Sequence, residues 1–306
     1  MSTILITGAT GFIGGYILRF FHDKGLNVIA HGSNKKSIKD LKDNLEQENL
    51  NFSKIKFWAQ NFMAAEWEFP DFEKIDNIIH CAALTKVREG TLDNYENYFK
   101  VNVIGTKMLA KKALEEDINH FIYLSTGQVY GIPDQFPITE KTPKNPINLY
   151  GATKLMSEII IKSFGFFGLN YSIVRPFSIY GKGQNNIISI IIKKISNKSL
   201  LTIYGDGTQK RSFLHIRDFC KAVHLILGNP TCFQEEFNLA GPKEYSVNKL
   251  VNIISKILDK KPLIKYEDSE VNELSRNLAD LSKIKNLGFK VREDLEKFLE
   301  EEIKNL

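Results

Sequence analysis

Tyr150 and Lys154 are the two side chains of this 306-residue chain whose types and spacing most directly suggest chemistry. Residues four apart lie on one face of a helix, so a helix here would place a phenol beside an ammonium. A nearby cation stabilises a phenolate and brings proton transfer by a tyrosine closer to neutral pH. The pair therefore predicts a tyrosine that exchanges a proton with a substrate.

A second pair, Tyr245 and Lys249, has the same spacing in a chain that contains 11 tyrosines. About one such pair is expected by chance in a lysine-rich sequence of this kind. Only the first pair follows a predicted strand, which ends in Leu124-Ser125-Thr126, and lies downstream of a glycine-rich loop. We therefore interpret the second pair as a chance occurrence.

The glycine-rich loop follows a short apolar run, Thr3–Ile6, that is typical of a buried parallel strand. Apolar residues then recur at helical spacing as far as Gly25, which is placed to end the helix, and residues 26–30 form a second strand. In such a βαβ unit the glycines and the helix N-terminus bind a pyrophosphate. The predicted contacts to a dinucleotide are Gly8, Thr10, Gly11, Phe12, Ile13 and Gly14.

The loop has the spacing G-x-x-G-x-x-G, and together with Tyr150 and Lys154 it resembles the extended short-chain dehydrogenase/reductase family. That family includes nucleotide-sugar epimerases, dehydratases and ketoreductases, and the resemblance covers essentially the whole chain. It implies an α/β fold: a Rossmann-type doubly wound parallel sheet with a smaller C-terminal α/β substrate lobe. Residues 1–176 would bind the dinucleotide, 216–241 would rejoin that domain, and 177–215 and 242–306 would form the lobe.

The residues after the second strand indicate which cofactor is preferred, because an acid there bonds the adenosine ribose of NAD and repels the 2'-phosphate of NADP. Here the chain reads His31-Gly32-Ser33-Asn34-Lys35-Lys36, with no acid before Asp40. The predicted contacts are Ser33, Asn34 and Lys35, which favour NADP, with NAD possible. The alternative is a solvated basic loop at the start of the next helix.

The resemblance implies further cofactor contacts in four places. Asn61 stands where the family usually has an aspartate that reads the adenine, with Phe62 beside it, and Ala82 and Ala83 lie in a small-residue loop after the fourth strand. Asn102 matches the helix asparagine near the nicotinamide. Tyr150, Lys154 and Phe177 complete the predicted cofactor contacts.

The resemblance also implies catalytic and substrate-binding residues. The catalytic residues would be Thr126, which positions the substrate oxygen, Tyr150, which moves its proton, and Lys154, which lowers the pKa of the tyrosine and holds the nicotinamide ribose. Besides Thr126, the predicted substrate contacts are Lys86 and Arg88 beside the sugar, Ser178 in place of a common asparagine, and Arg211 at the diphosphate.

These features predict an NAD(P)-dependent oxidoreductase that acts at C4 of a nucleoside-diphosphate sugar. The main hypothesis is a 4-keto-sugar reductase that uses exchangeable NADPH. The alternative is a 4-epimerase with tightly held NAD, and a third possibility is a non-catalytic protein that senses NADP. Gly127 and Gln128 stand where the related 4,6-dehydratases have an aspartate and a glutamate, which argues against elimination of water.

Composition narrows the remaining classes. A net charge of +5 spread along the chain argues against a nucleic-acid partner. Three cysteines without disulfide or metal-ligand spacing predict reduced thiols and no metal site, and the absence of a signal peptide or a long apolar run predicts a cytoplasmic protein without a membrane segment. The family resemblance implies a homodimer that forms through a four-helix contact.

Overall fold

The computed structural model describes residues 2–87, 90–268 and 275–304. The chain divides into two compact units, each of which draws on three segments. The first unit comprises Met1–Gly131, Lys144–Arg175 and Val223–Phe237, and the second comprises Ile132–Pro143, Pro176–Ala222 and Asn238–Leu306. The domain boundaries predicted from the sequence remain predictions.

A seven-stranded sheet with the order β10-β6-β5-β4-β1-β2-β3 organises the first unit. Its strands are β1 (Thr3–Thr7), β2 (Asn27–Gly32), β3 (Ile55–Ala59), β4 (Asn77–His80), β5 (His120–Leu124), β6 (Tyr171–Pro176) and β10 (Glu235–Leu239). Strand β1 pairs in parallel with both β2 and β4, so the strand order reverses there, where ligands bind in doubly wound sheets. The predicted Rossmann-type fold class is confirmed.

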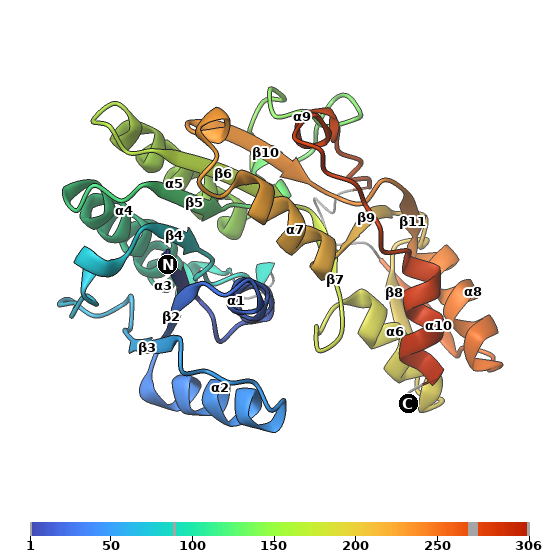
Figure 1. Ribbon diagram of the computed structural model, residues 1–306. Coiled ribbons are helices and arrows are strands. Elements are labelled where there is room, and N and C mark those ends of the chain that lie inside the picture. The colour runs from blue at the N-terminus through green and yellow to red at the C-terminus, as the bar shows by residue number, and fades with distance from the viewer. Residues whose placement is uncertain (1, 88–89, 269–274, 305–306) are drawn as a thin grey trace. The chain divides into compact units, whose positions relative to one another are not determined.

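The larger helices that accompany this sheet are α1 (Phe12–Asp23), α2 (Lys35–Gln47), α4 (Gly105–Glu115), α5 (Leu149–Gly165) and α7 (Ile216–Ile226). Helices α4 and α5 lie side by side (Figure 1). Helix α1 ends as predicted, because Gly25 has a φ of +82° and its N–H and that of Leu26 bond the His22 and Phe21 carbonyls. This is the Schellman arrangement that glycine favours.

A continuous helical stretch carries Asn102, and its middle departs from α-helical geometry. The structure has a short helix η3 (Leu92–Asn94), then α3 (Tyr95–Tyr98), a π-helical turn η4 (Phe99–Ile104), and α4. Asn102 lies inside the π-helical turn, where its carbonyl oxygen accepts hydrogen bonds from the hydroxyls of Thr106 (2.5 Å) and Ser157 (2.7 Å). Short π-helical turns are frequent at functional sites.

The second unit contains two small sheets and a helical core. The strands are β7 (Ser178–Tyr180), β9 (Lys210–His215) and β11 (Glu244–Ser246) in one sheet, and β8 (Leu201–Tyr204) and β12 (Ile264–Glu267) in the other. The helices are α6 (Ile187–Ser196), α8 (Val247–Leu258), α9 (Ser282–Asn286) and α10 (Leu295–Lys304). Helices α6, α8 and α10 enclose an apolar core that includes Tyr245 (Figure 1).

A buried ionic cluster joins α5 to the sheet. The Arg175 guanidinium donates to both carboxylate oxygens of Glu158 (2.8 and 2.7 Å), and neither side chain is more than 1% exposed. Arg175 also donates to the Tyr130 hydroxyl (2.8 Å) and pairs with Glu236 on β10 (2.6 Å), while the Ser125 hydroxyl donates to Glu158 (2.5 Å). Every polar atom of a buried pair needs such partners.

We expect Glu158→Gln to lower the free energy of unfolding by about 3–5 kcal/mol, because it leaves the Arg175 charge buried without its main partner. The control is Glu115→Gln, which removes the exposed ion pair with Lys111 and should cost no more than about 0.5 kcal/mol. Urea unfolding of both variants measures the difference. Equal losses would show that the buried pair does not hold α5 in place.

Candidate active site

The glycine loop forms a tight cradle between β1 and α1. Gly8 has a φ of +68°, and a Cβ at this position would lie 2.8 Å from the Ala82 nitrogen. A Cβ at Gly14 would overlap the Gly8 carbonyl, and Gly11 caps α1 without using a side chain. The backbone N–H groups of the first helical turn therefore stay open to an anion. The cradle fits the pyrophosphate of a dinucleotide.

His31, at the end of β2, braces this loop. Its Nδ1 accepts a hydrogen bond from the Gly8 N–H (3.1 Å), and its Nε2 donates to the Gln60 carbonyl (2.9 Å). Burial lowers the pKa of His31 to about 4, so the ring is neutral near pH 7 and Nδ1 remains an acceptor. The local sequence around His31 gives no sign of this role, because the contact with Gly8 joins residues 23 positions apart.

The three residues predicted to read the adenosine ribose are only partly available. The Asn34 side chain caps α2 by accepting from the Ser37 N–H (2.8 Å), while Ser33 and Lys35 are exposed, the latter as the first residue of α2. Gly32 lies beside them, and a Cβ there would be 2.7 Å from Thr10 Cγ2 and 2.8 Å from Ser37 Oγ. The end of β2 therefore has no space prepared for an acidic side chain.

Asn61 and Phe62, the two predicted adenine contacts after β3, lie in different surroundings. Asn61 is exposed, and its side-chain oxygen accepts from the Met63 N–H (2.9 Å), so its amide nitrogen faces away from that turn. The Phe62 ring, in contrast, is 5% exposed and stacks between His31 (4.4 Å) and Trp67 (4.2 Å). Phe62 thus belongs to the core and supports His31.

Asn102 links the loop after β4 to α5. Its side-chain oxygen accepts from the Leu84 N–H (2.8 Å), and its nitrogen donates to the Leu84 carbonyl and the Thr153 hydroxyl (3.0 Å each). Thr153 in turn donates to the Tyr150 carbonyl (2.9 Å). The predicted asparagine therefore positions the first turn of the tyrosine helix, and its side chain has few hydrogen-bonding positions left for a ligand.

A directed hydrogen-bond chain runs through the fully buried His80. The Ala82 N–H donates to the Thr7 hydroxyl (3.2 Å), which bonds His80 Nδ1 (2.6 Å), and His80 Nε2 bonds the Thr106 hydroxyl (2.9 Å). Because Thr106 donates its proton to the Asn102 carbonyl, we assign the proton of His80 to Nε2. Burial lowers the pKa of His80 far below its usual value, so this chain is neutral.

Thr126 and Tyr150 come together where β5 ends and α5 begins. Asn148 caps α5 by accepting from the Gly151 N–H (2.8 Å), which starts the helix one residue before Tyr150. Burial raises the pKa of Tyr150 to about 12, and a hydrogen bond with Thr126 acts in the opposite direction. The structure therefore brings together two of the three predicted catalytic side chains.

Lys154, the third, is 1% exposed and follows Tyr150 by one helical turn. Its ammonium lies 4.1 Å from the centroid of the Tyr123 ring, and burial lowers its pKa to about 7. The expected lowering of the pKa of Tyr150 by this lysine is not found, because burial dominates at both groups. A ligand group that accepts a hydrogen bond from the ammonium would favour the charged lysine beside the phenol.

The predicted substrate contacts of the second unit have partners within it. Ser178 accepts from the Asn277 side chain (3.2 Å), and the Arg211 guanidinium donates to the Lys210 carbonyl (2.9 Å). The predicted cofactor contact Phe177 donates its N–H to the Leu239 carbonyl (2.9 Å). All of these contacts lie inside the second unit.

Two predicted substrate contacts lie after β4 in the first unit. The Lys86 side chain is exposed, and its main-chain oxygen accepts from the Tyr98 hydroxyl (2.6 Å). This bond fixes the main chain of the loop at Lys86. Arg88 lies outside the described residues.

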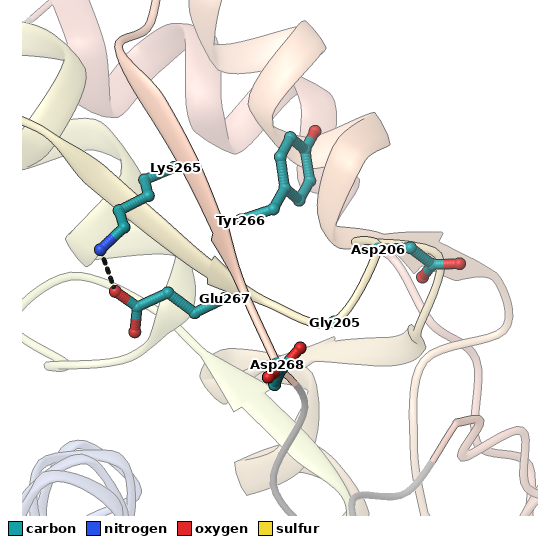
Figure 2. A pocket seen from close by; sticks show the side chains of 6 residues that line it. All are labelled: Gly205, Asp206, Lys265, Tyr266, Glu267 and Asp268. Carbon is teal, nitrogen blue, oxygen red and sulfur yellow. Dashed lines mark ion pairs between the residues drawn. The ribbon is translucent and has the colours of Figure 1, made fainter.

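A hollow in the second unit does not coincide with the predicted site. It measures about 1060 Å³ and lies beside the ends of β8 and β12, lined by Gly205, Asp206, Lys265, Tyr266, Glu267 and Asp268 (Figure 2). Three of these side chains are acidic, and Lys265 pairs with Glu267 (2.8 Å). Such a lining disfavours a diphosphate.

Among the residues that the structure describes, no helix is long and apolar enough to cross a membrane. No group of three or more histidine, cysteine or acidic side chains in the same part of the chain is arranged to hold a metal ion. None of the three cysteines is in a disulfide bond.

Comparison with known proteins decides the family. A model described as the NAD dependent epimerase/dehydratase family matches residues 4–240. The chain belongs to this family. An uncharacterised UDP-glucose epimerase of Bacillus subtilis (strain 168) is 33% identical over 294 residues, which cover 93% of this chain and 91% of that protein. A UDP-glucuronate 4-epimerase of Thermodesulfobacterium geofontis is 29% identical, with 94% and 90% covered.

Solved structures of this epimerase/dehydratase family match over the whole chain. The UDP-glucuronic acid 4-epimerase of Bacillus cereus, in complex with UDP-glucuronic acid and NAD, has a TM-score of 0.87 at 26% identity, with 99% of each chain covered. The UDP-glucose 4-epimerase of Thermotoga maritima with UDP-glucose has a TM-score of 0.84 at 25% identity, with 99% of this chain and 97% of that chain covered.

Family membership confirms the resemblance to the extended short-chain dehydrogenases/reductases and the prediction of an NAD(P)-dependent enzyme. The alternative of a non-catalytic sensing protein is accordingly set aside. The roles of the individual site residues remain predictions.

Removing the buried lysine tests the electrostatics of the site. At and below pH 7 Lys154 is protonated in the folded chain, so burial of its charge opposes folding most strongly there. As the pH rises from about 7 towards 10.5 the unfolded chain binds more protons than the folded one, and stability should rise by about 1.4 kcal/mol per pH unit. Lys154→Met should therefore be more stable than the wild type near pH 7, with a gap that narrows at higher pH.

Urea unfolding of the protein without cofactor, at about pH 7 and about pH 9, measures this gap. The control is Lys111→Met, which removes an exposed lysine of α4 and should give a difference that hardly depends on pH. A Lys154→Met gap that stays constant between the two pH values would contradict the lowered pKa.

Proposed function

We propose that the protein is a UDP-sugar 4-epimerase that keeps NAD bound through the reaction. The observation that carries the proposal is the full-length similarity to 4-epimerases, of which one is solved in complex with UDP-glucuronic acid and NAD and another with UDP-glucose. The 4-keto-sugar reductase favoured by the sequence is the weaker hypothesis, because it rested on the missing acid after β2. The sequence-based alternative thus becomes the main proposal.

Different residues of the first unit take the separate catalytic roles that such a reaction requires. Bound NAD supplies a hydride acceptor and, once reduced, a hydride donor. Tyr150 takes the proton from the C4 hydroxyl and later returns it to the oxygen of the 4-keto sugar. Thr126 orients that oxygen, and the protonated Lys154 favours the phenolate. The glycine cradle and His31 hold the loop that faces the pyrophosphate.

NAD fits the observed end of β2 as well as NADP does. The absence of an acid removes a barrier to a 2'-phosphate, but Asn34 is committed to capping α2, and the site offers only the exposed Ser33 and Lys35 in its place. Complexes of the Bacillus cereus 4-epimerase contain NAD. The predicted preference for NADP is therefore not supported, and NAD is the proposed cofactor.

The two positions that supply the acid and the base in the related 4,6-dehydratases carry neither group here. Gly127 has no side chain, and the Gln128 amide accepts a hydrogen bond from Asn148 (3.1 Å), which caps the tyrosine helix. On the following loop Glu140 accepts from the Asn238 N–H (2.8 Å) and serves the backbone there. These contacts favour epimerisation over the dehydratase activity that some relatives carry.

We further propose a homodimer that forms through the outer face of α5. Met156 and Ile159 are 39% and 60% exposed on consecutive turns of this helix, and α4 lies beside it. Exposed apolar side chains on one helix face suit a second copy of the same surface. Light scattering of the wild type and of Ile159→Glu tests this arrangement.

A single assay distinguishes the three possible reactions. The purified protein is incubated with UDP-glucose or UDP-glucuronic acid, without added cofactor, and the products are analysed by mass and by NMR. An epimerase yields an isomer of unchanged mass that is inverted at C4, and NAD is released when the protein is denatured. A product that has lost water, or a strict need for added NADPH and a 4-keto substrate, would contradict the proposal.

Tyr150→Phe should lower kcat by at least ~100-fold, the scale of a lost general acid or base, with little change in stability or NAD content. Tyr245→Phe is the matched control, since Tyr245 likewise precedes a lysine by four residues but lies in the core of the second unit. Loss of activity in Tyr245→Phe with full activity in Tyr150→Phe would show that the wrong pair was chosen.

A further inference from the structure

The ammonium of Lys154 lies over the face of an aromatic ring. Tyr123 lies on β5 with no exposed surface, and its ring centroid is 4.1 Å from the Lys154 ammonium. At this distance the negative face of the ring attracts the cation, and the attraction is strongest where water is excluded. No role for Tyr123 follows from the glycine loop or from the tyrosine–lysine pair.

Several other groups surround the ammonium. The titratable groups that face Lys154 from α5, β4 and β5 are His80, Cys81, Tyr123, Tyr150 and Glu158. Glu158 is occupied by Arg175 and Ser125, and burial keeps His80 neutral. Cys81 raises the pKa of Lys154 more than Glu158 does, and the ring of Tyr123 lies directly against the ammonium in addition to these two charges.

We propose that Tyr123 is a positioning residue that holds the Lys154 ammonium through its ring face and leaves the N–H donors of that ammonium for ligands. The proposal rests on the proposed function, in which Lys154 assists Tyr150. A carboxylate in the same place would accept one or two of the three N–H groups. A ring attracts the charge without accepting a conventional hydrogen bond, so the lysine stays in place and remains able to donate.

The Tyr123 hydroxyl is not needed for this role. It makes no well-formed hydrogen bond among the described residues, although Thr106 and Ser157 lie beside it and donate to the Asn102 carbonyl. A buried hydroxyl without a good partner costs free energy, so its removal should be tolerated. The proposed role of Tyr123 therefore depends on its aromatic ring and not on its hydroxyl.

Three variants test it. Tyr123→Phe keeps the ring, whereas Tyr123→Leu and the longer, more flexible Tyr123→Met remove it, and circular dichroism identifies which of them fold. The titration of Lys154 is followed in each folded variant by NMR of lysine labelled with ¹³C at Cε, with the signal assigned from its absence in Lys154→Met. This readout needs no substrate, and the pH profile of kcat is recorded separately.

In Tyr123→Phe we expect the Lys154 titration and kcat to match those of the wild type. In the Leu or Met variant the titration and the alkaline limb of the kcat profile should move down by about one pH unit, because the protonated lysine has lost the ring. An unchanged titration after loss of the ring would overturn the proposal, as would a large loss of kcat in Tyr123→Phe. If the titration behaves as expected but UDP-sugars are not converted, the proposed function fails and the positioning role stands.

Discussion

The bidentate pair between Arg175 and Glu158 is the interaction on which the site depends. Two opposite charges removed from water are tolerated only if their geometry is good and their remaining polar atoms are bonded. Here the pair itself joins β6 to α5, and Ser125 directly after β5, Tyr130, and Glu236 on β10 supply further partners. Because Glu158 lies one turn beyond Lys154 and two beyond Tyr150, fixing its rotation about the helix axis fixes theirs.

A second constraint acts at the other end of the same helix and uses neutral groups. The hydrogen-bond chain from Thr7 through His80 and Thr106 reaches the Asn102 carbonyl, which the π-helical turn leaves accessible. The Asn102 side chain then holds Leu84 and Thr153. The ends of β1 and β4, where a dinucleotide is bound in such folds, are thereby tied to the helix that carries the tyrosine.

Much of the fold and part of the site follow from sequence, because glycine positions, apolar periodicity and the tyrosine–lysine spacing act locally. The end of α1 at Gly25 rests on such a local rule, whereas the family resemblance implied the nearness of Thr126 to Tyr150. What sequence reasoning missed depends on long-range contacts. The contact between His31 and Gly8, the stacking of Phe62, and the ring of Tyr123 under Lys154 each join residues from different strands or loops. The π-helical turn interrupts no apolar pattern, so periodicity alone could not reveal it.

Gly32 has a consequence for any redesign of cofactor choice. The usual way to strengthen NAD binding is to place an aspartate at the end of the second strand, where it bonds the ribose diol. In this chain that side chain would meet Thr10 Cγ2 at 2.7 Å and Ser37 Oγ at 2.8 Å, and Ser37 is engaged with Asn34 in starting α2. A single substitution would therefore disturb the helix start. Shortening Thr10 would remove only the nearest of these contacts, because Ser37 Oγ and Ile38 Cδ1 (2.9 Å) would still crowd the new Cβ. An acid at this position therefore requires changes in the first turn of α2 as well.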